Sequence, residues 1–411
     1  MNEVMIFDAA TGKSKNAPQT LSHGRSNEPK PLLMHYGGWV NVARFAPMCA
    51  DETSPGIEGS HLAVGGYDYT VKLFNAVTGE MLLRLMHDNA VRDICFSPDG
   101  RLLASGGRDQ HMRIWDTSSG KSLRSEKLSG REVLCVDFDP RGSRLAVGGA
   151  NKEAQLYMLR SRTETATVTR AKVQERGISW SRDDDSTKSK LLALLLVHED
   201  PAVKNDPSQM KRLRKGEVAP MPVKLEVYQL HGTIVDPVPV HQDGPFSRGD
   251  IVGVAFSPHE DRLILLGKYS GLREYAYTHN DGARATFREA QALAEPPSDL
   301  VALSFARRPL DAAGDGSHMS RMIACVNGDG YPLLHDLNTS SWHALRVIEP
   351  DDERSNGANG EKDEPKFPGV VRVPAVCIGE CAADHVVELH SGRQMQLEAA
   401  KLLGNARVPT W

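Results

Sequence analysis

The sequence has little of what would tie the chain to a membrane, a disulfide framework or a metal. Its longest strongly apolar run, Leu191–Val197, has seven residues, whereas a membrane-spanning helix needs about 20. Six cysteines are spread over 411 residues, and Cys377 and Cys381 lack the spacing of a zinc knuckle. The first residues do not form a secretory signal. We therefore expect an intracellular protein, cytoplasmic, nuclear or both, with reduced cysteines, no transmembrane segment and no structural metal.

A strong charge of either sign is also missing. Lys and Arg number 49 against 53 Asp and Glu, which gives a net charge of −4. A chain this close to neutrality has no global attraction for nucleic acid or an anionic membrane, so such binding would require a local patch.

Common catalytic motifs are absent as well. The sequence contains no GxxxxGK[ST] phosphate loop, no GxSxG nucleophile turn and no HExxH zinc motif. His385 and His390 flank a strand-like segment at a spacing that places them on opposite faces, and His198 with Glu199 has no third ligand nearby. We expect no cofactor, no metal and no enzymatic activity.

What the sequence does have is an internal repeat. Three successive segments, 59–80, 87–121 and 133–159, share short apolar runs separated by turn residues. The aromatic residues near their ends, Phe74, Trp115 and Tyr157, are 41 and 42 residues apart. This period is the one expected of four-stranded blades in a β-propeller.

The local chemistry of the second segment explains its shape. Val91–Phe96 alternates with period two and is predicted to be a strand. Ser97–Gly100 has the Pro, Asp and Gly of a turn. Leu102–Ser105 is a short apolar strand buried on both faces, and Met112–Trp115 is a third strand. Each segment therefore supplies successive strands of one small sheet.

Fainter copies continue to the end of the chain, and Val370–Leu389 holds at least two further strands. Blade openings are predicted near residues 40, 91, 133, 177, 251, 300 and 370, which favours seven blades. Val4–Lys13 copies the third strand and turn at 71–80, so the chain begins in mid-blade. Because open sheet edges aggregate, we predict that these N-terminal strands complete the C-terminal blade. The alternatives are eight blades or an N-terminally truncated ring.

The predicted organisation is a single all-β propeller domain over residues 1–411, with the clearest repeats at about 60–160 and an N-terminal half-blade at 1–22. Four stretches break the period and are predicted to be loop insertions: 13–35, 48–60, 198–222 and 349–366.

The repeat resembles the WD40 family, the G-protein-beta-like propellers. Residues 87–121 carry a His at the blade entry, then FSPDG, LASGG, an Asp six residues before a Trp, and IWD. In that family a His, a Ser or Thr, an Asp and a Trp form a hydrogen-bonded chain inside one blade. The resemblance assigns this structural tetrad to His87, Ser105, Asp109 and Trp115.

The tetrad is complete only in this segment. The preceding one keeps Asp68 but has Val64 and Phe74 at the Ser and Trp positions. Ser, His and Asp are also the residue types of a hydrolase triad. Here their spacing belongs to a network of buried polar atoms that satisfy one another, and we interpret it as structural.

The resemblance also implies a partner-binding face at the narrow end of the ring, near its central channel. Trp, Tyr and Arg dominate interface energy when exposed, and such a set suits a peptide with acidic and apolar groups. A purely structural alternative is that Trp39 and Tyr67 pack between blades. The positions that correspond to this face are Trp39, Asn41, Tyr67, Arg92, Arg108, Arg176 and Lys268.

The expected function is that of a non-catalytic scaffold or adaptor, a subunit of a larger complex that binds proteins or peptides. The alternative is a propeller that binds nucleic acid or phosphoinositides through the basic loop 204–215, with Lys211, Arg212, Arg214 and Lys215. That loop contains no aromatic residues on which bases could stack. A propeller enzyme would need His, Asp and Glu clustered around the channel.

Overall fold

The structure, a computed structural model, describes the following residues: 2–8, 33–47, 61–76, 78–128, 132–150, 153–159, 165–169, 171–181, 190–197, 222–231, 234–246, 250–257, 260–268, 271–278, 284–290, 300–305, 322–327, 332–336, 341–348, 376–381, 384–390 and 396–401. All regular elements in these ranges are β-strands, and all their pairings are antiparallel. The predicted insertions 48–60 and 349–366 lie outside them.

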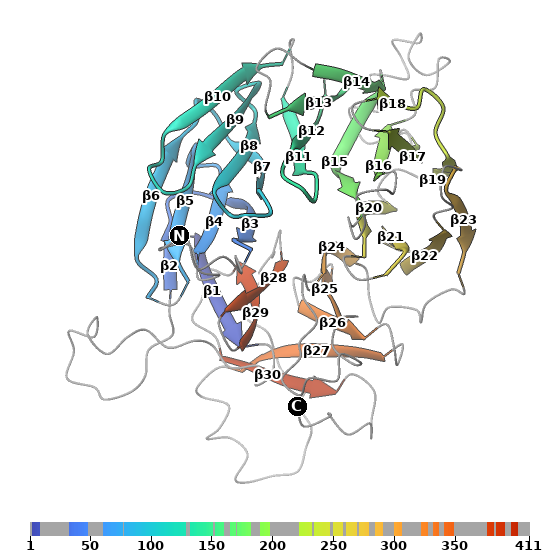
Figure 1. Ribbon diagram of the computed structural model, residues 1–411. Helices are drawn as coiled ribbons and strands as arrows, with labels where there is room; N and C mark the ends of the chain where they lie inside the picture. Colours follow the sequence, from blue (N-terminus) through green and yellow to red (C-terminus); the bar gives the residue numbers. More distant parts are fainter. Residues whose placement is uncertain are drawn as a thin grey trace, which may run out of the picture.

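The described strands form seven sheets, one near each predicted opening. Figure 1 shows these sheets arranged around a central axis. We number them as blades 1 to 7 in the chain order of their inner strands.

Blades 1 to 3 have four strands each, in simple up-and-down order. Blade 1 contains β3 (Val40–Phe45), β4 (His61–Gly66), β5 (Thr70–Asn75) and β6 (Met81–Met86). Blade 2 contains β7 (Val91–Phe96), β8 (Leu102–Gly107), β9 (His111–Asp116) and β10 (Ser122–Lys127). Blade 3 contains β11 (Val133–Phe138), β12 (Arg144–Gly149), β13 (Ala154–Met158) and β14 (Thr165–Thr169).

Blades 4 to 6 keep this order, and blades 4 and 6 have one additional strand each at the outer edge. Blade 4 contains β15 (Lys172–Trp180), β16 (Lys190–Val197), β17 (Val223–His231), β18 (Ile234–Val235) and β19 (His241–Phe246). Blade 5 contains β20 (Ile251–Phe256), β21 (Arg262–Gly267), β22 (Gly271–Thr278) and β23 (Thr286–Glu289). Blade 6 contains β24 (Leu300–Phe305), β25 (Met322–Asn327), β26 (Pro332–Asp336), β27 (Ser341–Ile348) and β30 (Gln396–Lys401).

Blade 7 joins the two ends of the described chain, as the sequence predicts. Its strands are β28 (Val376–Cys381), β29 (Asp384–His390), β1 (Asn2–Asp8) and β2 (Leu33–Tyr36). Residues of β1 pair with β29 from Val4↔His390 to Asp8↔Val386. Figure 1 shows the blue β1 beside the red β29. The N-terminal strand therefore completes the C-terminal sheet.

Two features of the fold differ from the sequence-based prediction or were missed by it. The predicted insertion 13–35 is wrong at its last three residues, because β2 begins at Leu33 and pairs with β1. The outer edge of β1 requires a partner, and the short alternating segment Leu33–Tyr36 supplies it. The sequence also gave no sign of β30, which pairs with β27.

The apolar core lies between successive blades. All eight residues of β16 are buried, as are five of the six in β8. One core cluster joins Val71 of blade 1 to Ile94 and Leu103 of blade 2. In contrast, the outer strand β10 exposes most of its residues. Each blade therefore buries its inner strands against its neighbours, and its rims remain available for contacts.

Candidate partner-binding surface

A backbone hydrogen bond recurs at one rim of several blades. The N–H of Tyr67 donates to the carbonyl of Trp39 at 2.8 Å, and the N–H of Arg108 donates to Ala90 at 2.8 Å. In blade 3 the N–H of Ala150 donates to Glu132 at 3.0 Å. In each case the donor follows the second strand and the acceptor precedes the first. This bond places these residue pairs at equivalent positions on one rim.

A glycine at the end of the second strand allows this close approach. A Cβ built on Gly66 would lie 2.0 Å from the Trp39 carbonyl oxygen. A Cβ on Gly107 would lie 2.7 Å from the Ala90 carbonyl oxygen. No side chain fits at either position without movement of the backbone, so the repeated Gly-Gly pair fixes the geometry of the rim.

The predicted residues Trp39, Tyr67 and Arg108 meet at this rim. Trp39 is 71% exposed. Its ring meets the Tyr67 ring edge to face, with centroids 5.9 Å apart. The guanidinium of Arg108 lies over the Tyr67 ring, 5.8 Å from its centroid. This distance is within reach of a cation–π attraction. The large exposed fraction of Trp39 shows that this side chain does not pack between blades.

Glu132 extends this cluster to blade 3. Its Oε2 accepts hydrogen bonds of 3.2 Å from the Nε atoms of both Arg92 and Arg108. Two guanidinium groups therefore share one carboxylate, which leaves the cluster with an excess positive charge. The sequence analysis missed Glu132, although it directly precedes β11 as Trp39 precedes β3. We call Trp39, Tyr67, Arg92, Arg108 and Glu132 the Trp39 surface.

The remaining predicted residues are not part of these ring and ion-pair contacts. The Asn41 side chain donates to the backbone carbonyl of Val91 at 2.7 Å, so it links blade 1 to blade 2. Lys268 follows β21 at the equivalent rim of blade 5, and its N–H donates to the Asp250 carbonyl. Arg176 belongs to β15, and its side chain lies outside the described part of the structure. The structure brings neither Asn41 nor Lys268 into the Trp39 surface.

The four predicted tetrad residues form one hydrogen-bonded chain in blade 2. The indole N–H of Trp115 donates to Ser105 Oγ at 2.8 Å. Ser105 Oγ lies 2.7 Å from His87 Nε2, and His87 Nδ1 lies 3.1 Å from Asp109 Oδ2. A neutral His87 with its proton on Nδ1 satisfies both of these contacts: it donates to Asp109 and accepts from Ser105.

Electrostatics favour this protonation state. Burial lowers the pKa of His87, although the adjacent Asp109 carboxylate opposes that effect. Burial alone would raise the pKa of Asp109, but hydrogen bonds from His87 and Arg113 outweigh it and hold that pKa well below its usual range. Ser105 is fully buried, so no substrate reaches its hydroxyl in this arrangement.

Blade 1 has a different network at the same positions, which the sequence analysis missed. Tyr36 precedes β3 by four residues, as His87 precedes β7. Its hydroxyl donates to the Thr70 carbonyl at 2.6 Å, and Lys72 Nζ lies 4.6 Å from the Tyr36 ring centroid. Lys72 Nζ pairs with Asp68 at 3.0 Å. Burial and the Asp68 carboxylate raise the pKa of Tyr36.

The signal that could have revealed this network is the spacing of an acid and a base. Asp68 pairs with Lys72, and Asp109 pairs with Arg113, each four residues on. Both bases occupy the third position of the third strand.

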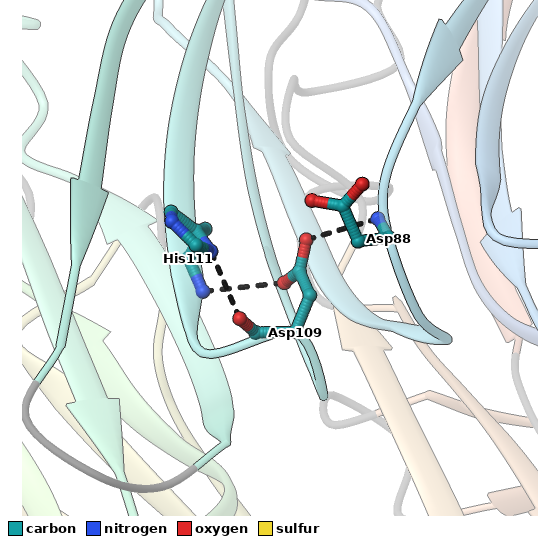
Figure 2. Close-up of side chains that lie close together, drawn as sticks. All are labelled: Asp88, Asp109 and His111. Atoms are coloured by element: carbon teal, nitrogen blue, oxygen red, sulfur yellow. Dashed lines mark hydrogen bonds between the residues drawn. The ribbon is translucent and has the colours of Figure 1, made fainter.

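Asp88, Asp109 and His111 are close enough together to resemble a metal site (Figure 2). Their contacts are local: the N–H groups of Asp88 and His111 both donate to the Asp109 carboxylate, at 3.2 Å each. Arg113 pairs with Asp109 and, at 3.0 Å, with Asp88. A guanidinium therefore already supplies the positive charge that these two carboxylates attract.

The basic loop 204–215, with Lys211, Arg212, Arg214 and Lys215, lies outside the described residues. Among the described cysteines, Cys95, Cys135 and Cys325 are buried free thiols. In those ranges no helix is long and apolar enough to cross a membrane.

Comparison with known protein families identifies two repeats in the chain. The family model "WD domain, G-beta repeat" matches residues 79–116 and 120–157. Each match covers the outer strand of one blade and the three inner strands of the next.

Curated relatives match over about a third of the chain. The WD repeat and SOCS box-containing protein 1 of Homo sapiens is 35% identical over 154 residues, 34% of this chain and 36% of the relative. The U3 small nucleolar RNA-associated protein 15 homolog of Bos taurus is 30% identical over 140 residues, 34% of this chain and 24% of the relative. The matches thus span about a quarter to a third of these relatives.

Among solved structures, the β-propeller domain of Cps50 (Swd1) from Myceliophteria thermophila superposes with a TM-score of 0.52. The alignment covers 86% of this chain and 100% of that domain at 11% identity, which supports the fold alone. The two matched repeats and the blade topology show that the chain contains WD40 repeats and has the β-propeller fold.

Proposed function

We propose that the chain is a non-catalytic interaction scaffold, a subunit of a larger intracellular complex, and that a partner protein contacts the Trp39 surface. The observation that carries this proposal is the 71% exposure of Trp39 beside Tyr67 and Arg108. Exposing a tryptophan to water is unfavourable, and Trp, Tyr and Arg are the residues that most often dominate binding energy.

Charge suggests the chemistry of the partner. The Arg108 side chain pairs with Glu132 but is 43% exposed, so its guanidinium can also reach a carboxylate of a ligand. A peptide that places an apolar side chain against Trp39 and a carboxylate beside Arg108 would satisfy both parts of the surface. We therefore propose a partner segment with adjacent apolar and acidic residues.

The tetrad supports the non-catalytic half of the proposal. Its Ser, His and Asp are engaged with Trp115 and with one another, and the Ser105 hydroxyl is buried. The names of the relatives are consistent with a scaffold in the cytoplasm or nucleus: one contains a SOCS box and WD repeats, and another is associated with U3 small nucleolar RNA.

The test is quantitative affinity capture from the source cells with the tagged full-length chain and two variants, Trp39→Ala and Arg108→Glu. We expect both to lose the same partner. Truncation of an anchor residue costs about 2 kcal/mol or more, about a 30-fold loss of affinity. Leu123→Ala is the matched control, because Leu123 is also exposed but lies on β10.

Circular dichroism melting of each variant separates lost binding from lost folding. Unchanged recovery of all partners by folded Trp39→Ala and Arg108→Glu proteins would refute the proposal.

A further inference from the structure

The outer strand of blade 1, β6, has an apolar edge. Met81, Leu82 and Met86 are 50%, 40% and 57% exposed. Among the described strands, β6 pairs only with β5, so its other edge has no partner there. Soluble proteins usually protect edge strands with charges or proline, but β6 contains no proline and one charged residue, Arg84.

The equivalent strand of blade 2 has the usual protection. β10 occupies the same outer position, and its sequence SLRSEK places Arg124, Glu126 and Lys127 along the edge. Two neighbouring blades with the same topology therefore differ in this one property. The apolar edge of β6 is a feature of this strand and not of the repeat.

The strand register shows which backbone groups face outward. The His87 N–H donates to the Tyr69 carbonyl at 2.8 Å, and Thr70 lies opposite Met86 and Lys72 opposite Arg84. Because antiparallel pairs alternate between bonded and non-bonded, the backbone N–H and C=O groups of Arg84 and Met86 point away from β5. The edge thus offers donors and acceptors between exposed apolar side chains.

The same fold already accepts a fifth strand at an outer edge. In blade 6, β27 pairs with β30 from His343↔Lys401 to Ile348↔Gln396. The outer edge of a blade in this protein is therefore geometrically able to receive another antiparallel strand.

Charge decides between a second copy of this chain and a different partner. Only every second residue of β6 presents its backbone groups outward. Antiparallel pairing of β6 with the β6 of a second copy therefore places the two Arg84 side chains opposite or diagonal to each other. Like charges in these positions are destabilising. Arg84 forms no ion pair with another described residue, and Lys72 across from it is already paired with Asp68. An acidic residue in the added strand would complement Arg84.

We propose that the β6 edge binds an extended segment of a partner protein as an additional antiparallel strand, with an acidic residue of that segment opposite Arg84 and apolar residues beside Leu82 and Met86. This site is separate from the Trp39 surface and does not depend on it. Backbone bonds supply affinity in this mode of recognition, and alternate side chains supply specificity.

The first test measures binding of labelled peptides to the full chain by fluorescence anisotropy. One peptide alternates valine and threonine around a central glutamate, and its twin has a central lysine. One cross-strand charge pair is worth about 0.2–1 kcal/mol, so we expect the glutamate peptide to bind up to about fivefold more tightly. Arg84→Glu should reverse this preference.

The second test removes one outward N–H from the protein. Met86→Pro should weaken binding of the glutamate peptide about threefold to tenfold, the worth of one hydrogen bond. Lys127→Pro is the control, because Lys127 of β10 corresponds to Met86 of β6. The residue after Lys127, Leu128, donates its N–H to the Gln110 carbonyl at 2.8 Å, as His87 after Met86 donates to Tyr69. A glutamate peptide that is N-methylated on the edge facing β6 loses the same kind of backbone hydrogen bond. Its binding tests the role of these bonds without a change to the protein.

Three results would overturn the proposal. The first is a peptide preference that Arg84→Glu leaves unchanged. The second is equal binding of the N-methylated and unmodified peptides. The third is a homodimer of the chain, measured by light scattering, that Met86→Pro dissolves, since the occupant would then be a second copy.

Discussion

Blades 1 and 2 have the same strand order, the same rim hydrogen bond and the same acid–base pair, yet they build their polar interiors from different residues. Blade 2 uses His87, Ser105 and Trp115 around Asp109. Blade 1 has Tyr36 in the place of His87, with Val64 and Phe74 in the places of the other two. The comparison teaches that the fold requires an Asp at this turn whose carboxylate is hydrogen-bonded and ion-paired. The residues that serve as its partners can differ between blades.

Removal of that acid should have the largest effect in both blades. Asp109→Ala leaves the buried Arg113 with only the exposed Asp88 as an ion-pair partner, and the loss of one member of a buried pair costs about 3–5 kcal/mol. Asp68→Ala should destabilise the chain by a similar mechanism through Lys72. Urea unfolding monitored by circular dichroism measures both.

The control for these variants is Asp88→Ala, because Asp88 also pairs with Arg113 but its side chain is 82% exposed. We expect its effect to stay below about 1 kcal/mol. Equal losses for Asp88→Ala and Asp109→Ala would contradict the importance of the buried acid.

The rim glycines should show a smaller effect that differs between the blades. Gly66→Ala places a Cβ 2.0 Å from the Trp39 carbonyl oxygen, against 2.7 Å from the Ala90 carbonyl oxygen for Gly107→Ala. Overpacking of this kind costs about 1–3 kcal/mol, and we expect Gly66→Ala to be the more destabilising of the two. Thermal melting of both variants measures the order, and the reverse order would show that the rim of blade 1 adapts.

Exchange of residues between the networks should cost about 1–2 kcal/mol at each step. Trp115→Phe removes the donor to Ser105 Oγ. In blade 1, Phe74→Trp buries an indole N–H with no acceptor, because Val64 stands at the Ser position. Addition of Val64→Ser should recover part of that loss in a double-mutant cycle. No recovery would mean that the two networks are not equivalent in geometry.

The smallest expected effect is the pH dependence that His87 of blade 2 contributes. Burial lowers the folded-state pKa of His87 below its ordinary value of 6.5, so the unfolded chain binds a proton more readily. Stability from this group is present above that value and is lost as pH falls toward the folded pKa, by at most about 1.4 kcal/mol per pH unit. When the pH is lowered from 7.5 to 5.5, the unfolding midpoint should fall more for the wild type than for His87→Gln. Parallel decreases would show that His87 carries no such linkage.

The parts of the fold that depend on local chemistry were predictable from the sequence. Alternation in Val91–Phe96 and the Gly-rich turns indicated the strands, and the 41-residue and 42-residue spacings indicated blades. The copy of a third strand at Val4–Lys13 predicted how β1 meets β29. Among the proposed face residues, Trp39, Tyr67 and Arg108 do come together.

The missed features depend on contacts between distant segments. Pairing of β30 with β27 is set by a register that no local pattern encodes. Tyr36 was hidden because it replaces a histidine with a different residue type, and Glu132 was hidden because its role is defined by two arginines of the neighbouring blade.

Site-specific photo-crosslinking tests the scaffold proposal most directly. A photoreactive phenylalanine analogue is placed at position 39 and, in a separate protein, at position 123 on β10. We predict a discrete crosslinked partner from position 39 that disappears when Arg108 is changed to Glu, and no such product from position 123. Absence of a product at position 39, or one that persists in the Arg108→Glu protein, would contradict a partner-binding role for the Trp39 surface.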